Sequence, residues 1–213
     1  MPAQPLLAQL DLSELEDCIP EQIRSIVLVS NAELELCKST LELIKTSAPC
    51  LFVHHNTAKN LDLLRRKYPT NSCEMLFIRG NGIGYWGLKD STGEPFYSSR
   101  SDIQHCGIFA LRGQLDLSNR PEIQKINLSW LTTLEQQEHY PHNKRPSTGF
   151  YTRKLFEAVG HRRANIQVCT LGFSPDPGYW NNSMTHHHDF SFEAKELHHS
   201  EQLQRHHPLD RAN

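Results

Sequence analysis

Short apolar runs alternate along the chain with stretches in which apolar residues recur at every third or fourth position. The runs predict buried strands, and the stretches predict helices that cover a sheet. Strands are expected at residues 25–30, 49–53, 74–78, 106–111, 126–130 and 166–171. Helices are expected at residues 32–46, 58–67, 148–159 and from 189 onward. This alternation is typical of an α/β fold with a mostly parallel sheet.

The last two helices have recognisable ends. Pro146-Ser147-Thr148-Gly149 is a helix start, and Gly160 is expected to stop that helix. Residues 172–185 contain two prolines and two glycines, which predicts an irregular loop over a site. The inward face of the last helix is expected to consist of Phe190, Ala194 and Leu197.

The composition favours one globular domain in 213 residues, because 38% are hydrophobic and 22% charged. We divide the chain into an N-terminal extension at 1–24, an α/β domain at 25–199 and a polar, disordered tail at 200–213. No run approaches the roughly 18 apolar residues of a membrane span, and no secretory signal is recognisable, so we expect a cytoplasmic protein.

Charge and cysteine usage disfavour two further classes of protein, those that bind nucleic acid and small disulfide-rich scaffolds. Lys+Arg 22 against Asp+Glu 24 gives a net charge of -2, which disfavours nucleic acid as the main partner. The six cysteines are spread along the chain with no C-x-x-C pair, so reduced and mostly buried thiols are expected.

Polar residues follow three of the expected strands, as Ser30-Asn31, His55-Asn56 and Arg79-Gly80-Asn81. Ligands of open α/β sheets bind beyond the carboxyl ends of the strands, so these asparagines can converge on one polar ligand. An amide both donates and accepts, which suits a nucleobase edge or a ribose. Asparagine also favours turns and caps, which is the alternative explanation.

The segment Ser147-Thr148-Gly149 places hydroxyls and free backbone N–H groups at a helix N-terminus. Such a terminus carries partial positive charge and suits an anion or a nucleotide. Helix capping alone would explain Ser147 or Thr148 equally well.

A cluster of histidines and carboxylates runs from His186 to Glu193. His188 is a candidate general base, because the unperturbed pKa of histidine is near working pH. Zinc binding by His187, His188 and Glu193 or His198 is an alternative, although the spacing matches no H-E-x-x-H or Cys/His signature. A solvated histidine cluster is a third reading.

Five segments together resemble the sialyltransferase superfamily, whose members transfer acidic sugars from CMP-sugars. Val27 to Asn31 resembles the first strand and its asparagine, and Val53 to Asn56 resembles a second strand ending in Arg-x-Asn, with His54 in place of the arginine. Arg145 to Phe150 resembles the P-S-T-G segment that cradles cytidine, and Ile166 to Phe173 resembles the strand that follows it. His188 to Glu193 is similar to the H-x-x-x-x-E motif, whose histidine is the catalytic base.

The resemblance implies a single Rossmann-like domain, a GT-A-like variant, in which residues 25–199 bind a nucleotide sugar. It implies inverting transfer to a glycan or glycolipid hydroxyl, with no metal or other cofactor. His188 would be the base, Asp189 or Glu193 would orient it, and Tyr179, or else His186, would support the leaving phosphate. The implied donor-binding residues are Asn31, Asn56, Arg79, Asn81, Ser147, Thr148, Gly149, Phe173 and His186.

Two departures and two alternatives accompany this reading. The first turn, Asn31-Ala32-Glu33, lacks the family's glycine, and residues 80–140 match no part of the family. A nucleotide-binding protein without transferase activity is one alternative, and a metal-dependent hydrolase that uses the histidines is the other. The donated sugar, the acceptor, a peripheral contact with a membrane and the oligomeric state are left open.

Overall fold

The computed structural model describes residues 11–31, 49–56, 58–68, 72–78, 107–110, 123–125, 139–144, 146–173 and 188–196. The described strands form one sheet of β1 (Ser25–Val29), β2 (Cys50–His55), β3 (Ser72–Ile78), β4 (Ile108–Ala110), β5 (Ile123–Lys125) and β6 (Gln167–Leu171). The described helices are α1 (Ser13–Asp17), α3 (Leu61–Lys67), α5 (Thr148–Arg162) and a short helix at 190–196. All the strand pairs are parallel, which confirms an α/β fold with a parallel sheet, compatible with a Rossmann-like domain.

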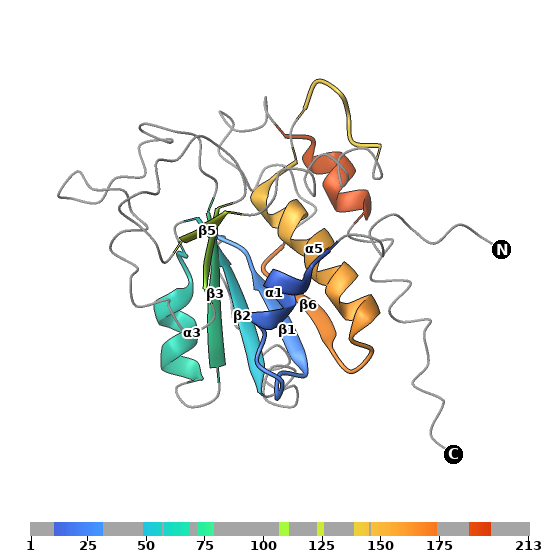
Figure 1. The fold of residues 1–213 in the computed structure, drawn as a ribbon. Helices are drawn as coiled ribbons and strands as arrows, with labels where there is room; N and C mark the ends of the chain where they lie inside the picture. Colours follow the sequence, from blue (N-terminus) through green and yellow to red (C-terminus); the bar gives the residue numbers. More distant parts are fainter. Residues whose placement is uncertain are drawn as a thin grey trace, which may run out of the picture.

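The strand order is β5-β4-β3-β2-β1-β6, so the chain first moves outward from β1 and later returns to the other side of β1 (Figure 1). The order therefore reverses between β1 and β6. In open α/β sheets a ligand crevice forms beyond the carboxyl ends of the strands at this reversal. The register places Val29 beside Leu171, so the residues that follow β1 and β6 emerge together.

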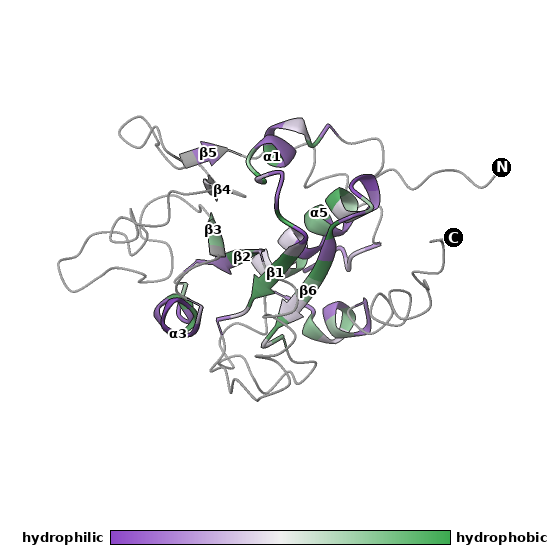
Figure 2. Ribbon diagram, turned by 90° about the horizontal axis from the view of Figure 1, so that it is seen from below, coloured by the Kyte–Doolittle hydropathy of each residue, from purple (hydrophilic) through white to green (hydrophobic). Residues whose placement is uncertain are grey.

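Helices cover both faces of the sheet, with α3 on one face and α1 and α5 on the other (Figure 2). Successive strand residues point to opposite faces, so the two faces use alternate positions. In β1, Ile26 and Leu28 belong to the core under α5, whereas Val27 and Val29 join a smaller cluster with Leu64 of α3. Burial on both faces explains why this strand reads as a continuous apolar run.

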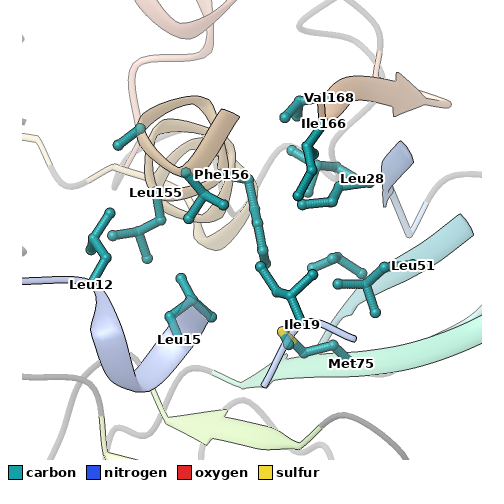
Figure 3. Close-up of a cluster of buried hydrophobic side chains, with 14 of the residues drawn as sticks. Leu12, Leu15, Ile19, Leu28, Leu51, Met75, Leu155, Phe156, Ile166 and Val168 are labelled. Carbon is teal, nitrogen blue, oxygen red and sulfur yellow. The ribbon is translucent and has the colours of Figure 1, made fainter. Parts of the chain in front are cut away.

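The larger core joins α1, α5 and the sheet (Figure 3). Four residues from the first 24 positions belong to this core, and each is at most 3% exposed: Leu12, Leu15, Ile19 and Ile23. The described part of the segment that we assigned to an N-terminal extension is thus built into the same core as the strands.

The helix α5 does not stop at Gly160, as the sequence had suggested, but continues to Arg162. A Cβ added at Gly160 would lie 3.3 Å from a methyl group of Val168. The glycine thus allows close approach between α5 and β6 and does not act as a terminator. The helix ends where the N–H of Arg163 donates to the carbonyl of Val159.

Some of the other sequence predictions can be compared with the structure, and some fall on residues that it does not describe. The strand expected at 126–130 falls outside the described residues, and β5 lies just before it. The helix expected at 32–46 also lies outside them. Cys18, Cys50, Cys73 and Cys169 are free thiols, as predicted, but among these four only Cys50 is buried, whereas mostly buried thiols were expected. Burial raises the pKa of the Cys50 thiol to about 11. No helix in the described part of the chain has the length and apolar character needed to cross a membrane.

Candidate functional site

The turn that follows β1 is fixed by hydrogen bonds to the ends of two other elements. The Ser30 N–H donates to the Leu171 carbonyl at 2.9 Å, and its hydroxyl donates to the Gly172 carbonyl at 2.6 Å. The side-chain amide of Asn60 donates to the Ser30 carbonyl at 2.7 Å. The turn beside the strand-order reversal therefore has a defined shape.

Asn31 links the turns that follow β1 and β2. Its Nδ2 donates to the His55 carbonyl at 2.8 Å, and its Oδ1 accepts from the backbone N–H of Lys59 at 3.2 Å. Both ends of the amide thus make hydrogen bonds within the protein. This is the turn-stabilising role that the sequence offered as the alternative to ligand binding. A direct contact with a ligand stays a prediction.

Asn56 comes directly after β2 with φ 47°, in the left-handed region that asparagine adopts more readily than most residues. Its backbone N–H donates to the Phe77 carbonyl at 2.8 Å. This turn directs the side-chain amide toward α5, where Nδ2 lies 3.5 Å from the Thr148 hydroxyl oxygen. Two predicted donor-binding residues, 92 positions apart in sequence, therefore meet between the end of β2 and the start of α5.

The N-terminus of α5 lies beside the carboxyl end of β2. Ser147 is the N-cap, and its hydroxyl accepts from the Phe150 N–H at 3.1 Å. Gly149 faces the half-buried ring of Phe173, because an added Cβ would lie only 2.7 Å from Phe173 Cε1. The absence of a side chain at Gly149 lets Phe173 reach the first turn of the helix.

The sequence placed His55 at the end of a strand, beside Asn56, without giving it a role in the site, but its ring lies at the centre of this arrangement. Its side chain is 4% exposed; Nδ1 lies 2.8 Å from the Val29 carbonyl and Nε2 lies 2.6 Å from the Thr152 hydroxyl. The ring also meets Phe173 edge-on, with ring centres 5.9 Å apart. Burial lowers the pKa of His55 to about 4, so the imidazole is neutral near pH 7.

A second group of hydrogen bonds ties the helix at 190–196 to the N-cap of α5. Glu193 Oε1 accepts from the Ser147 N–H at 2.7 Å and from the Tyr140 hydroxyl at 2.9 Å, while Oε2 accepts from the Ser147 hydroxyl at 2.6 Å. Burial raises the pKa of Glu193 to about 7, although the bonds from Ser147 and Tyr140 lower it. The Tyr140 hydroxyl also accepts from the Asp189 N–H at 3.0 Å.

The described contacts between this last helix and α5 are made by residues that the predicted inward face did not include. Phe192 packs against the rings of Tyr140 and Phe150. Farther along, the Glu196 carbonyl accepts from the Arg153 guanidinium at 3.0 Å, and its carboxylate lies 3.3 Å from Lys154 Nζ. Phe192, Glu193 and Glu196 thus make the described contacts with α5 and its N-cap, and Phe190 and Ala194, which were predicted to face inward, are half-buried. Leu197 lies outside the described residues.

His188 is 7% exposed and its ring centre lies 5.4 Å from that of Phe190. The Asp189 carboxylate accepts from the Phe192 N–H at 2.9 Å, which caps the following helix. The described hydrogen bonds of Asp189 and Glu193 thus stabilise helix starts, whereas we expected one of these carboxylates to orient the His188 imidazole. The bond from Glu193 to Ser147 nevertheless brings the segment that carries His188 to the N-terminus of α5.

Four predicted site residues, Arg79, Asn81, Tyr179 and His186, lie outside the described residues. Within the described ranges, no group of three or more His, Cys, Asp or Glu side chains is arranged to hold a metal ion. The zinc alternative also involves His187 and His198, which lie outside those ranges.

No family model, no curated protein and no solved structure matches this chain. The candidate site is therefore defined by its own geometry: the ends of β1, β2 and β6, the first turn of α5, and the segment that begins at His188.

Proposed function

We propose that this protein is an inverting glycosyltransferase that moves an acidic sugar, such as sialic acid or a Kdo-like sugar, from a CMP-sugar to a glycan hydroxyl. The observation that carries the proposal is a convergence at the strand-order reversal. Asn56 meets Thr148 there, and Glu193 fastens the segment of the candidate base, His188, to Ser147, the residue before Thr148. These contacts support the proposal that the binding groups and the candidate base act together beyond the carboxyl ends of a parallel sheet, where α/β proteins bind ligands.

The donor is proposed to bind across the end of β2 and the first turn of α5. The Asn56 amide and the Thr148 hydroxyl supply a donor and acceptor pair for the base or ribose. The backbone N–H groups of the first turn, at Thr148 and Gly149, offer partial positive charge to the phosphate or to the sugar carboxylate. Phe173 closes the side of the site next to β6.

In the proposed reaction, His188 takes the proton of an acceptor hydroxyl as the oxygen attacks the anomeric carbon. The bond from that carbon to the CMP phosphate breaks on the opposite face, so CMP leaves with the electron pair and the configuration inverts. Proton transfer to a positioned base contributes about 10²–10⁴-fold. We assign support of the leaving phosphate to Tyr179, with His186 as second choice. The scheme uses no metal.

Calorimetric titration tests whether the protein binds the cytidine nucleotide of the proposed sugar donor. The protein is titrated with CMP, UMP, GMP and AMP, with and without EDTA. We expect CMP-selective binding that EDTA leaves unchanged. Asn56→Ala and Thr148→Ala are each expected to weaken CMP binding by about tenfold, which corresponds to about 1.4 kcal/mol.

The chemical half is tested with His188→Ala, and Ser191→Ala serves as the control because Ser191 is exposed on the same segment. We expect His188→Ala to retain CMP binding and to lose transfer from CMP-linked acidic sugars, while Ser191→Ala retains both. Absence of a cytidine preference, or binding abolished by EDTA, would contradict the proposal and favour the metal-dependent alternative. CMP binding with no transfer to any glycan tested would indicate a nucleotide-binding protein.

A further inference from the structure

His55, at the end of β2, contacts three elements that meet at the strand-order reversal. Its ring bonds to the Val29 carbonyl at the end of β1 and to Thr152 in the second turn of α5, and it meets Phe173, two residues after β6. Its own backbone carbonyl accepts the amide of Asn31. Because the ring is enclosed, each of these groups is fixed relative to the others.

The partners of His55 determine its protonation pattern. A carbonyl oxygen only accepts, so Nδ1 carries the proton and donates to Val29. The neutral ring then has a lone pair on Nε2, which accepts the hydroxyl proton of Thr152. Two carbonyls of the first turn of α5, those of Thr148 and Gly149, lie 3.0 and 3.1 Å from the same hydroxyl and compete for that proton.

We propose that His55 is a positioning residue: its bond with Thr152 holds the first turn of α5 in place against the end of β1, so that Thr148 and Gly149 face the nucleotide. Without the imidazole acceptor, the Thr152 hydroxyl turns back onto the carbonyls of its own helix, as threonine hydroxyls in helices do. The first turn then keeps its helical form but loses this tie to the sheet. The identity of the bound nucleotide rests on the proposed function, whereas the tie itself does not.

Paired substitutions at Thr152 separate this role from general stability. Thr152→Val removes the hydroxyl and nearly keeps the shape, and Thr152→Ser restores a hydroxyl. We expect Thr152→Val to weaken CMP binding about five- to tenfold, the range of one lost hydrogen bond, and Thr152→Ser to stay within about twofold of the parent protein. Equal binding by both variants would overturn the proposal.

Two further readouts do not depend on the ligand. Amide hydrogen exchange of Thr152→Val should be faster in the first turn of α5 and unchanged near Val159, since a positioning role is local. The ring ¹⁵N shifts of His55 should show a protonated Nδ1 and an unprotonated Nε2 whose shift changes in Thr152→Val. Uniformly faster exchange along α5, or a proton on Nε2, would overturn the proposal.

The results of these experiments distinguish a failure of the proposed function from a failure of the proposed role of His55. If the parent protein does not bind CMP, the proposed function fails, and exchange and ring shifts alone decide the role of His55. If the parent binds CMP and Thr152→Val binds it equally well, the role of His55 fails and the proposed function stands.

Discussion

The two ends of α5 are buried by different means. Toward its C-terminus, Leu155, Phe156 and Val159 lie fully buried among apolar side chains. At its N-terminus, Ser147 and Thr152 are held by hydrogen bonds to Glu193 and His55, from two other parts of the chain.

This difference means that one end of α5 mainly stabilises the protein, whereas the other end mainly positions the residues of the candidate site. Apolar burial is nondirectional and scales with area, so the C-terminal half of α5 contributes mainly to stability. Hydrogen bonds require aligned partners and contribute only about 0.5–1.5 kcal/mol net, so the N-terminal end contributes mainly to the geometry of the candidate site. Substitutions at the two ends should therefore change different measured quantities.

The largest effect is expected at the apolar end. Phe156→Ala removes a fully buried ring that packs edge-on against Phe77, with ring centres 5.7 Å apart. We expect a loss of about 3–5 kcal/mol in the free energy of unfolding, measured by urea denaturation. CMP affinity of the folded protein should change little. A loss under about 1 kcal/mol would mean that the two ends are not packed differently.

The next effect concerns the charge of Glu193 at the polar end. Because its folded pKa, about 7, lies above the ordinary value of 4.5, the folded state is favoured below pH 4.5 and loses this advantage as pH rises to 7. Glu193→Gln keeps the shape and cannot ionise. Its stability relative to the parent should therefore increase by up to about 3 kcal/mol between pH 4.5 and 7.5.

Urea denaturation at several pH values measures that difference. Glu196→Gln is the matched control on the same helix, because Glu196 faces the cation of Lys154, whereas the described bonds to Glu193 come from neutral donors. Parallel stability curves for Glu193→Gln and the parent protein would contradict the assignment.

A smaller effect is expected at the N-cap. Ser147→Ala removes the hydroxyl that caps α5 and donates to Glu193. We expect a loss of about 1–2 kcal/mol in unfolding free energy, together with weaker CMP binding, since the cap holds the first turn. Ser147→Thr retains the hydroxyl and is expected to restore most of both. Loss of stability without any change in binding would separate the cap from the site.

The smallest effects, from the two glycines of α5, compare its ends directly. Alanine at Gly149 meets the Phe173 ring at 2.7 Å, whereas alanine at Gly160 meets a Val168 methyl group at 3.3 Å. Alanine also gains about 1 kcal/mol of helix propensity at interior positions. We expect Gly160→Ala to be neutral within about 0.5 kcal/mol and Gly149→Ala to weaken CMP binding while costing about 1 kcal/mol. Equal effects on binding would remove the distinction between the ends.

Much of the fold was predictable because both faces of the sheet are covered. Strands buried on both faces, such as β1 and β2, are apolar runs that local sequence reveals. The start of α5 was equally visible, because Pro146 and Ser147 are typical of helix N-termini. Gly160 misled the prediction, since a glycine in a close helix–strand contact has the same sequence signal as one that ends a helix.

The candidate site was predictable only in pieces. Asn56 and Thr148 were recognised by their places after a strand and at a helix start. His55 was placed at the end of a strand but given no role, and Thr152 and Tyr140 were missed, although Thr152 lies one helical turn after Thr148. Nothing local to Tyr140 indicates that its hydroxyl joins Glu193 and Asp189.

The sequence by itself determined where the start of α5 and every described strand except β5 lie, because burial and capping leave local, periodic signals. The tertiary structure alone decided the strand order and therefore which polar residues meet. His55 and Thr152 are 97 residues apart, and Ser147 and Glu193 are 46 apart. Such contacts depend on how the chain returns to pack β6 against β1, and no local pattern of residues encodes that return.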